Sequence, residues 1–486
     1  MRARRWAGTR RVRLPKLSAT LLSDYPTIRP SDPALLKPRS QDIRALLRLA
    51  IPVVVVQVGL MLMSTVDTLM VGRVSASALA AVAIGSLFSM VATFFGQGVL
   101  MSLDPLVSQA AGAGDHRSIA LGVQRGIILA VVLTVPLAFY HLAAGALLRL
   151  LGQPSDVVPL AHAYNAALIP GLLPYFGFIV FRQTLQALHR LRAIVVTILV
   201  ANLANVVINW MFIFGNLGMP VLGVTGAAIA TSASRWLMAL MVLTLSWREL
   251  GPLLRPWLSA AWLPGPTIRM LRLGVPIALQ MELELTCFGA VALLAGAMGT
   301  LQVAGHQIAI NLAALTYMVP LGVSAAAAVM VGRAVGAGDP FDARRQAATA
   351  LLVGVGFMVT TALVFLTLSG PLARLYTTDA AVIAVAVSLI PLAGIFQVFD
   401  GTQVVAIGIL RGLADTHGPF VINALGYWAI GMPIGLVLAY PLGLGVVGLW
   451  WGLVIGLGTV GGILLVRTWR SFRRPFPRVD IEEAAA

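Results

Sequence analysis

The sequence IPVVVVQVGLMLMSTVDTLMVG, residues 51–72, decides the fold class of this protein. It is 22 residues long and carries a single charge, Asp67. At a rise of about 1.5 Å per residue, a helix of this length crosses a bilayer core of about 30 Å. A carboxylate inside such a helix costs on the order of 2.5–3.5 kcal/mol unless it faces a protein interior or a wet cavity. Asp67 is therefore interpreted as a titratable cation site on a transport path or as a buried contact between helices.

The composition extends this interpretation to all 486 residues. Hydrophobic residues make up 59% of the chain and charged residues 11%, whereas soluble domains carry about 25% charged residues. The net charge of +16 does not indicate nucleic acid binding, because the basic residues lie in tails and short loops between apolar segments. The composition predicts a polytopic membrane protein. Its single cysteine, Cys287, excludes an internal disulfide and a cysteine-based zinc site.

Twelve apolar segments are long enough to span a membrane, so the sequence predicts an all-α polytopic fold with twelve transmembrane helices. The expected spans are residues 44–72, 79–110, 118–147, 158–187, 192–215, 221–247, 270–297, 303–332, 343–371, 380–410, 418–439 and 444–468. Arginine residues gather in the loops on one side and in both tails. By the positive-inside rule, both termini are expected in the cytoplasm, and we expect a bacterial inner membrane protein.

An internal repeat relates the two halves of the chain. RLAIP at 48–52 recurs as RLGVP at 272–276, and GAGD at 112–115 recurs at 336–339, both at an offset of 224 residues. Six spans in each half bring both halves in from the same face, so the repeats are parallel. The predicted units are a basic, disordered cytoplasmic tail at 1–40, an N-lobe at 41–248, a cytoplasmic inter-lobe loop at 249–269, a C-lobe at 270–470 and a cytoplasmic tail at 471–486.

Acidic residues inside the expected spans are the first candidates for function. Besides Asp67 they are Asp104, Glu282, Glu284 and Asp400. Asp104 lies near the cytoplasmic end of the second span, where we expect water to reach it. On the tenth span, Phe396, Asp400 and Gln403 share one helix face at spacings of i, i+4 and i+7.

An asparagine stripe marks the fifth span. Asn202, Asn205 and Asn209 share one face at spacings of i, i+3 and i+7. Such a stripe either forms interhelical hydrogen bonds or lines a site beside Asp67, and the sequence leaves both open. No P-loop, dinucleotide-binding glycine pattern or histidine metal cluster occurs in the sequence. We therefore expect no catalytic residues, cofactor or resident metal, and an ion gradient as the energy source.

Several motifs resemble those of the MATE (multidrug and toxic compound extrusion) family, NorM-like branch. They are VDTLMVG at 66–72, LVSQAAGAGD at 106–115, NLANVVIN at 202–209, ELTCF at 284–288, AGHQIAIN at 304–311 and FQVFDGTQVVAIGILRG at 396–412. The resemblance covers roughly residues 41–470. It implies two six-helix lobes around a central cavity, and an antiporter that exports cationic, amphipathic drugs in exchange for Na+ or H+ by alternating access.

The resemblance also assigns roles to residues. It implies that Asp67 is the N-lobe acid, supported by Asn205 and Asn209, and that Glu284 and Asp400 bind the cation in the C-lobe. The further residues expected to line the cavity are Asn202, Gln307, Phe396 and Gln403.

The coupling ion is predicted from Phe396, where this chain departs from some members of the family. Some NorM-like members have tyrosine at this position, so a hydroxyl ligand for Na+ is missing here. Two carboxylates brought close can instead share a proton, which needs no such ligand. We therefore expect H+ coupling, with Na+ at Glu284 and Asp400 as the alternative and Gln403 as a candidate for the missing oxygen.

Two other functions are compatible with a polytopic chain. A flippase for lipid-linked precursors needs basic cavity residues for phosphates, and Arg182 and Arg235 are the midspan candidates. A membrane-embedded transferase needs a His/Asp or acidic motif with substrate loops at a membrane face, whereas these loops are short and the acids dispersed. The sequence favours the antiporter, acting as a monomer on small cationic drugs among membrane lipids.

Overall fold

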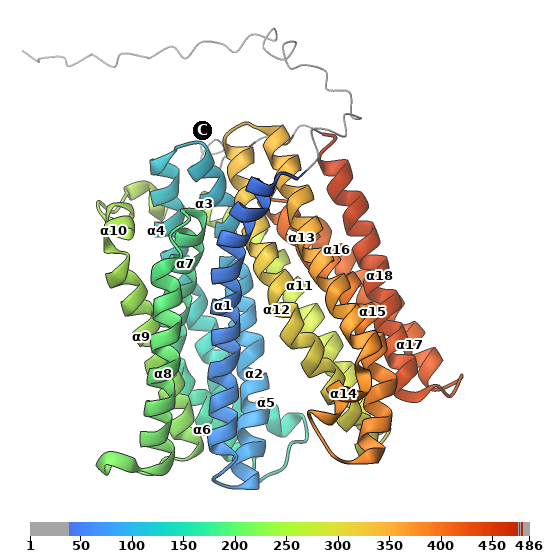
Figure 1. Cartoon of the computed structure of the whole chain (residues 1–486). Helices are drawn as coiled ribbons and strands as arrows, with labels where there is room; N and C mark the ends of the chain where they lie inside the picture. Colours follow the sequence, from blue (N-terminus) through green and yellow to red (C-terminus); the bar gives the residue numbers. More distant parts are fainter. Residues whose placement is uncertain (1–37, 475, 477, 480–486) are drawn as a thin grey trace, which may run out of the picture.

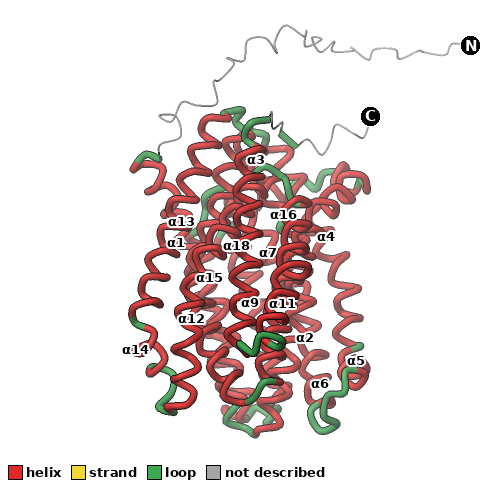
Figure 2. The backbone as a smooth tube through the Cα atoms, turned by 90° about the vertical axis from the view of Figure 1, so that its right-hand side faces the viewer, coloured by secondary structure: helices red, strands yellow, loops and turns green. Residues whose placement is uncertain are grey.

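The computed structural model describes residues 38–474, 476, 478 and 479. Their secondary structure is helical, without strands, and twelve helical segments are long and apolar enough to cross a membrane. Figure 2 shows these helices joined by short loops. The predicted all-α fold with twelve spans is confirmed. The basic tail expected at 1–40 lies outside the described residues, apart from its last three.

The first six spans form the N-lobe. They are α1 (Ser40–Val71), α2 with α3 (Ala76–Leu100 and Leu103–Gly112), α4 (His116–Leu142), α6 with α7 (Val158–Leu168 and Leu172–Ala187), α8 (Arg192–Phe214) and α9 (Val224–Leu245). The short helix α5 (Ala144–Leu150) follows α4, and α10 (Trp247–Leu254) follows α9.

The last six spans form the C-lobe. They are α11 (Pro264–Ala297), α12 (Thr300–Gly336), α13 (Pro340–Thr367), α15 (Ala380–Gly412), α16 with the π-helical η6 and α17 (His417–Asn423, Ala424–Gly431 and Met432–Ala439) and α18 (Gly445–Ser471). The short helix α14 (Ser369–Arg374) follows α13.

The segment expected to be an inter-lobe loop, residues 249–269, is largely helical. α10 covers its start, the 3-10 turn η5 (Ser259–Trp262) lies in its middle, and α11 begins at Pro264 rather than at residue 270. Proline suits the first turn of a helix because its missing N–H would have no partner there. The hydropathy pattern could not show this extra turn, since it lies outside the apolar run.

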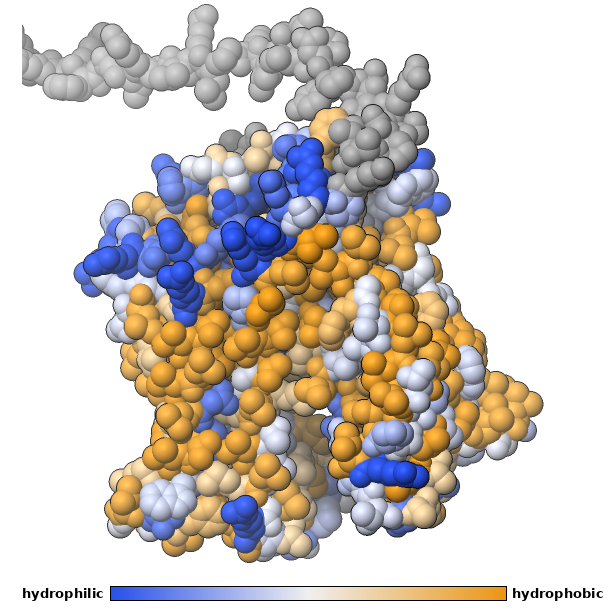
Figure 3. Space-filling model, in the orientation of Figure 1, coloured by the Kyte–Doolittle hydropathy of each residue, from blue (hydrophilic) through white to orange (hydrophobic). Residues whose placement is uncertain are grey.

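The two lobes meet at one end and diverge at the other. In Figure 1 the N-lobe helices, blue to green, approach the C-lobe helices, yellow to red, at the upper end. There α1 packs against α12, and α3 also contacts α12. Figure 3 shows hydrophilic residues at this end, an apolar band below it and a hollow between the lobes at the lower end. We call the upper end the closed end and the lower end the open end.

Polar contacts between lobes hold the closed end together. Arg411 on α15 pairs with Asp104 on α3, with 3.4 Å between Nη1 and Oδ2. Arg345 on α13 pairs with Asp42 on α1 at 3.1 Å. Asp104 is 3% exposed, so the expectation that water reaches it is wrong. The break between α2 and α3 places Asp104 in the contact between the lobes, where the C-lobe covers it.

The repeated GAGD motif contributes to the same contact. A Cβ atom on Gly112 would overlap the backbone carbonyl of Arg333, and one on Gly336 would overlap the backbone carbonyl of Gln109. The first glycine of each copy therefore lets α3 and the end of α12 approach at backbone distance. The internal repeat thus supplies both halves of one inter-lobe contact.

Candidate functional site

Asp67 is held by hydrogen bonds inside the N-lobe. One carboxylate oxygen accepts a hydrogen bond from Asn209 Nδ2 at 2.5 Å, and the other accepts one from Thr231 Oγ1 at 2.6 Å. Asp67 is 4% exposed, and no salt bridge to it occurs within the described part of the chain. The negative charge is therefore stabilised by neutral donors on α8 and α9. Because α1 runs from the closed end, Asp67 near its other end lies toward the open end.

The asparagines of the stripe on α8 make two kinds of contact. Asn209 Nδ2 also donates to Asn205 Oδ1 at 3.1 Å, and both residues are fully buried beside Asp67. Asn202 is only partly buried, and its Nδ2 donates to the carbonyl of Ile198, one turn earlier on the same helix, at 2.9 Å. The structure thus brings Asn205 and Asn209 to the acid but does not bring Asn202 there.

The C-lobe acids lie on two helices, Glu284 on α11 and Asp400 on α15, and interact electrostatically. The Tyr317 hydroxyl on α12 donates a hydrogen bond to Glu284. Asp400 is 5% exposed, and its buried Oδ1 has no hydrogen-bond partner among the described residues. The lobe therefore places two carboxylates and one hydroxyl within a region that contains an unused acceptor.

Aromatic side chains pack beside this pair of acids. Phe396 is 1% exposed, and its ring meets those of Phe288 and Trp450 edge to face, each at 5.8 Å between centroids. Tyr427, on η6, packs against Phe288 and donates its hydroxyl to Gln403 Oε1 at 3.0 Å. Phe396 is thus a packing residue, and Gln403 is fully buried with its carbonyl oxygen already bonded.

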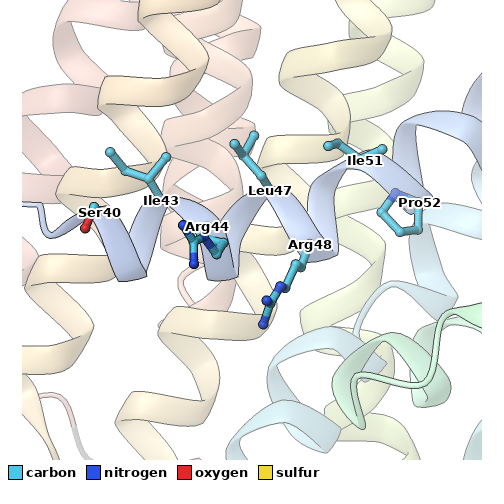
Figure 4. Close-up of a pocket in the computed structure, with 7 residues that line it drawn as sticks. All are labelled: Ser40, Ile43, Arg44, Leu47, Arg48, Ile51 and Pro52. Carbon is cyan, nitrogen blue, oxygen red and sulfur yellow. The ribbon is translucent and has the colours of Figure 1, made fainter.

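The remaining candidate, Gln307 on α12, is exposed. A surface pocket of about 530 Å³ runs along the outer face of α1 at the closed end, between Ser40 and Pro52 (Figure 4). None of the candidate acids lines it. No group of three or more His, Cys, Asp or Glu side chains that could hold a metal occurs within the described ranges.

The MatE family model matches residues 52–211 and 276–437 of the chain. This chain belongs to the MATE family. The two matches start at residues 52 and 276, which are 224 residues apart. The offset read from the sequence motifs is thereby confirmed as the repeat of the family itself.

Relatives of the MATE chain cover nearly its whole length. It is 38% identical over 446 residues to the “Probable multidrug resistance protein NorM” of Mesorhizobium japonicum, across 89% of this chain and 95% of that protein. The fold matches that of the eukaryotic MATE transporter AtDTX14 with a TM-score of 0.80, at 23% identity over 89% of this chain and 98% of that one. It also matches the Vibrio cholerae MATE transporter VcmN in the bent form, with a TM-score of 0.78 and 21% identity over 89% and 98%.

Three residues of the candidate site in this MATE chain escape sequence reasoning: Thr231 and Tyr317 bond to the candidate acids, and Tyr427 bonds to Gln403. Thr231 carries no signal, because threonine in a membrane helix usually bonds its own backbone one turn earlier. Tyr317 and Tyr427 do carry one. The chain has only 8 tyrosines, and a buried phenol usually needs a hydrogen-bond partner. Tyrosines in the middle of apolar spans could therefore have been counted among the candidates.

Proposed function

We propose that this chain exports cationic, amphipathic compounds from the bacterial cytoplasm in exchange for protons, acting as a monomer. Membership of the MATE family makes it a secondary antiporter of the multidrug efflux class, and the family consists of transporters rather than enzymes. The observation that carries the proposal is Asp67, a carboxylate buried in an apolar lobe and held only by neutral donors among the described residues. Such a group can exchange a proton for an organic cation.

The orientation follows from the basic residues at the closed end. Arg345 and Arg411 lie there with both ends of the described chain (Figure 1). Basic residues favour the cytoplasmic side of a bacterial membrane. The closed end therefore faces the cytoplasm, both termini lie inside the cell, and the hollow faces outward. This is the state in which an antiporter releases drug and takes up its coupling ion.

Protons are favoured as the coupling ion by the C-lobe contacts. The Gln403 carbonyl oxygen already accepts from Tyr427, so only its second lone pair remains for an ion at the place where Phe396 lacks a hydroxyl. Tyr317 contributes one hydroxyl on Glu284, which leaves a partial ligand set for Na+. A proton shared by Glu284 and Asp400 requires no further oxygen and satisfies the buried, unpartnered Oδ1 of Asp400. We therefore assign a coupling proton to these two acids, in addition to the proton exchanged at Asp67.

Drug susceptibility tests this function. In bacteria that lack their principal efflux pumps, expression of the chain should raise the tolerated concentrations of ethidium and other planar organic cations several-fold. It should leave the tolerated concentration of a neutral antibiotic of similar size unchanged, because that compound has no charge to place at Asp67. An unchanged profile with the protein present in the membrane would contradict the proposal.

A further inference from the structure

Arg235 is a charged group that the exchange of cation and proton does not use. It lies on α9 one turn after Thr231, whose hydroxyl donates to Asp67. Side chains four residues apart on a helix lie about 5–6 Å from each other, so Arg235 and Asp67 share one region of the N-lobe. Each acts electrostatically on the other. No salt bridge joins them in the described structure.

The surroundings of Arg235 leave donors unused. Its guanidinium carbon lies 4.8 Å from the centre of the Tyr175 ring, and its Cδ packs close to Gly171. Its Nη1 is buried and has no hydrogen-bond partner among the described residues. The residue as a whole is nevertheless only partly buried. A guanidinium inside a membrane protein is costly without an anion, and its planar fork of N–H donors fits a carboxylate.

The other midspan arginine differs from Arg235. Arg182 on α7 is 4% exposed and donates to Gln57 on α1 at 3.3 Å. The two arginines are therefore not presented together as a clamp for a phosphate, as a lipid-linked substrate would need. Of these two midspan arginines, Arg235 is the one that is not fully buried, and it has both an unpartnered donor and a carboxylate in the same region.

We propose that Arg235 binds the anionic group of a zwitterionic substrate whose ammonium group is held at Asp67. This inference rests on the proposed function and names a residue that selects among the substrates of the same site. A site with one fixed charge of each sign accepts a compact amphiphile of zero net charge without burying an uncompensated charge. Amphipathic amino carboxylates are the compounds that match it. Arg235 is then a residue that determines specificity, separate from the coupling acids.

A matched pair of substrates tests this role. The probes are a fluoroquinolone with a piperazine ammonium and a free carboxylate, and the ethyl ester of the same compound, which keeps only the cation. In membrane vesicles, Arg235→Gln should raise KM for the zwitterion about tenfold or more, corresponding to at least about 1.4 kcal/mol. Transport of the ester should stay at the wild-type level or improve, since the mutation removes a repelling charge. Arg235→Lys should recover part of the loss, because it restores the charge but not the planar fork.

The outcomes separate this inference from the proposed function. Equal loss of both substrates in Arg235→Gln, with normal behaviour in detergent, would reduce Arg235 to a structural contact with Tyr175. No change for either substrate would overturn the inference as well. If the wild-type protein transports neither compound nor ethidium, the proposed function itself fails.

A different observation carries a second inference, at the closed end. The Arg478 guanidinium pairs with Asp115, with 2.8 Å between Nη2 and Oδ2, and the backbone N–H of Val479 donates to Gln109 Oε1 at 2.9 Å. Arg478 follows α18 of the C-lobe. In the N-lobe, Gln109 lies in α3 and Asp115 directly precedes α4. Gln109 also donates to the carbonyl of Gly412 on α15 at 2.9 Å. The chain after α18 therefore joins the two lobes.

We infer that these contacts of Arg478 and Val479, here called the tail clasp, stabilise the state in which the closed end is shut. The alternate state of a two-lobed antiporter must separate α3 from the C-lobe, which breaks both contacts. Hydrogen bonds from Arg478 and from the Ser118 N–H hold the pKa of Asp115 at about 2, so the carboxylate is charged at every pH in a living cell. The clasp therefore stays formed near neutral pH, and rising salt weakens it.

The rate of cysteine labelling measures how much the tail clasp holds the closed end shut. Ser108 on α3 is fully buried at the closed end, so Ser108→Cys in a Cys287→Ala background reports each opening of that end to a maleimide. Arg478→Ala and Asp115→Asn should each speed labelling about two- to fivefold, the range for an exposed ion pair. The double variant should be no faster than either single one, and the swap Arg478→Asp with Asp115→Arg should restore slow labelling. Unchanged rates in both single variants, or additive effects, would overturn the clasp.

Discussion

Asp67→Asn is expected to abolish drug export while the protein still reaches the membrane in normal amounts. Asparagine has nearly the same shape and keeps one carbonyl oxygen to accept the hydrogen bond from Asn209. The Thr231 hydroxyl can rotate to accept from the new amide, so the local hydrogen bonds can be remade. Removing a buried charge also removes its desolvation cost, so we expect little change in stability. What the variant lacks is a group that can carry a proton in one state and balance an organic cation in the other.

Ethidium efflux measures this loss. Cells that express Asp67→Asn should match cells with no transporter, at every external pH from acid to neutral. Asn202→Ala is the matched control, because Asn202 bonds to the backbone of its own helix and should be dispensable for export. Export at the wild-type level by Asp67→Asn across this pH range would show that Asp67 is only a contact between α1, α8 and α9.

The limits of sequence reasoning are visible at this acid. Spacing on one helix places Asn205 and Asn209 on a common face, and charge in an apolar span identifies Asp67, because both signals are local. Thr231 lies 164 residues away along the chain, and only the packing of α9 against α1 brings its hydroxyl to the carboxylate. Helical periodicity fixes which residues share a face. It does not fix which face of which other helix they meet.

Asp104 illustrates the same limit for a charge near a span end. Its place near the end of an apolar run predicts access to water, since loops begin a few residues later. The partner that buries it, Arg411, lies 307 residues further along the chain and follows from the closed state of the two lobes. Arg411 also matches the basic pattern that predicts topology, so the sequence accounts for it without an ion pair. Because the topology already explains a basic residue at this position, the sequence gives no sign that Arg411 also pairs with Asp104.

Asp400→Asn is expected to uncouple or abolish proton-driven export. Asp400 and Glu284 lie on different helices and interact, so removing one acid removes the shared proton that makes the pair a coupling site. Glu284 keeps its hydrogen bond from Tyr317, which should preserve the local packing of α11 against α12. The measurement is ethidium transport by inverted membrane vesicles at a fixed pH gradient, with Na+ present or absent. Wild-type transport should need the pH gradient and not Na+, and Asp400→Asn should lose the response to the gradient.

Gln403→Leu separates proton from sodium coupling at this site. The Gln403 carbonyl oxygen accepts a hydrogen bond from the Tyr427 hydroxyl, so the leucine variant breaks a hydrogen bond between α15 and η6 without removing an acid. Under proton coupling it should lower the amount of folded protein more than the transport rate per molecule, because the Tyr427 hydroxyl loses its acceptor. If transport instead stops without Na+ and persists when the pH gradient is collapsed, the proton assignment is wrong. Asp400→Asn should then weaken the dependence on Na+ more than Gln403→Leu does, since a carboxylate contributes both charge and oxygen ligands to the ion.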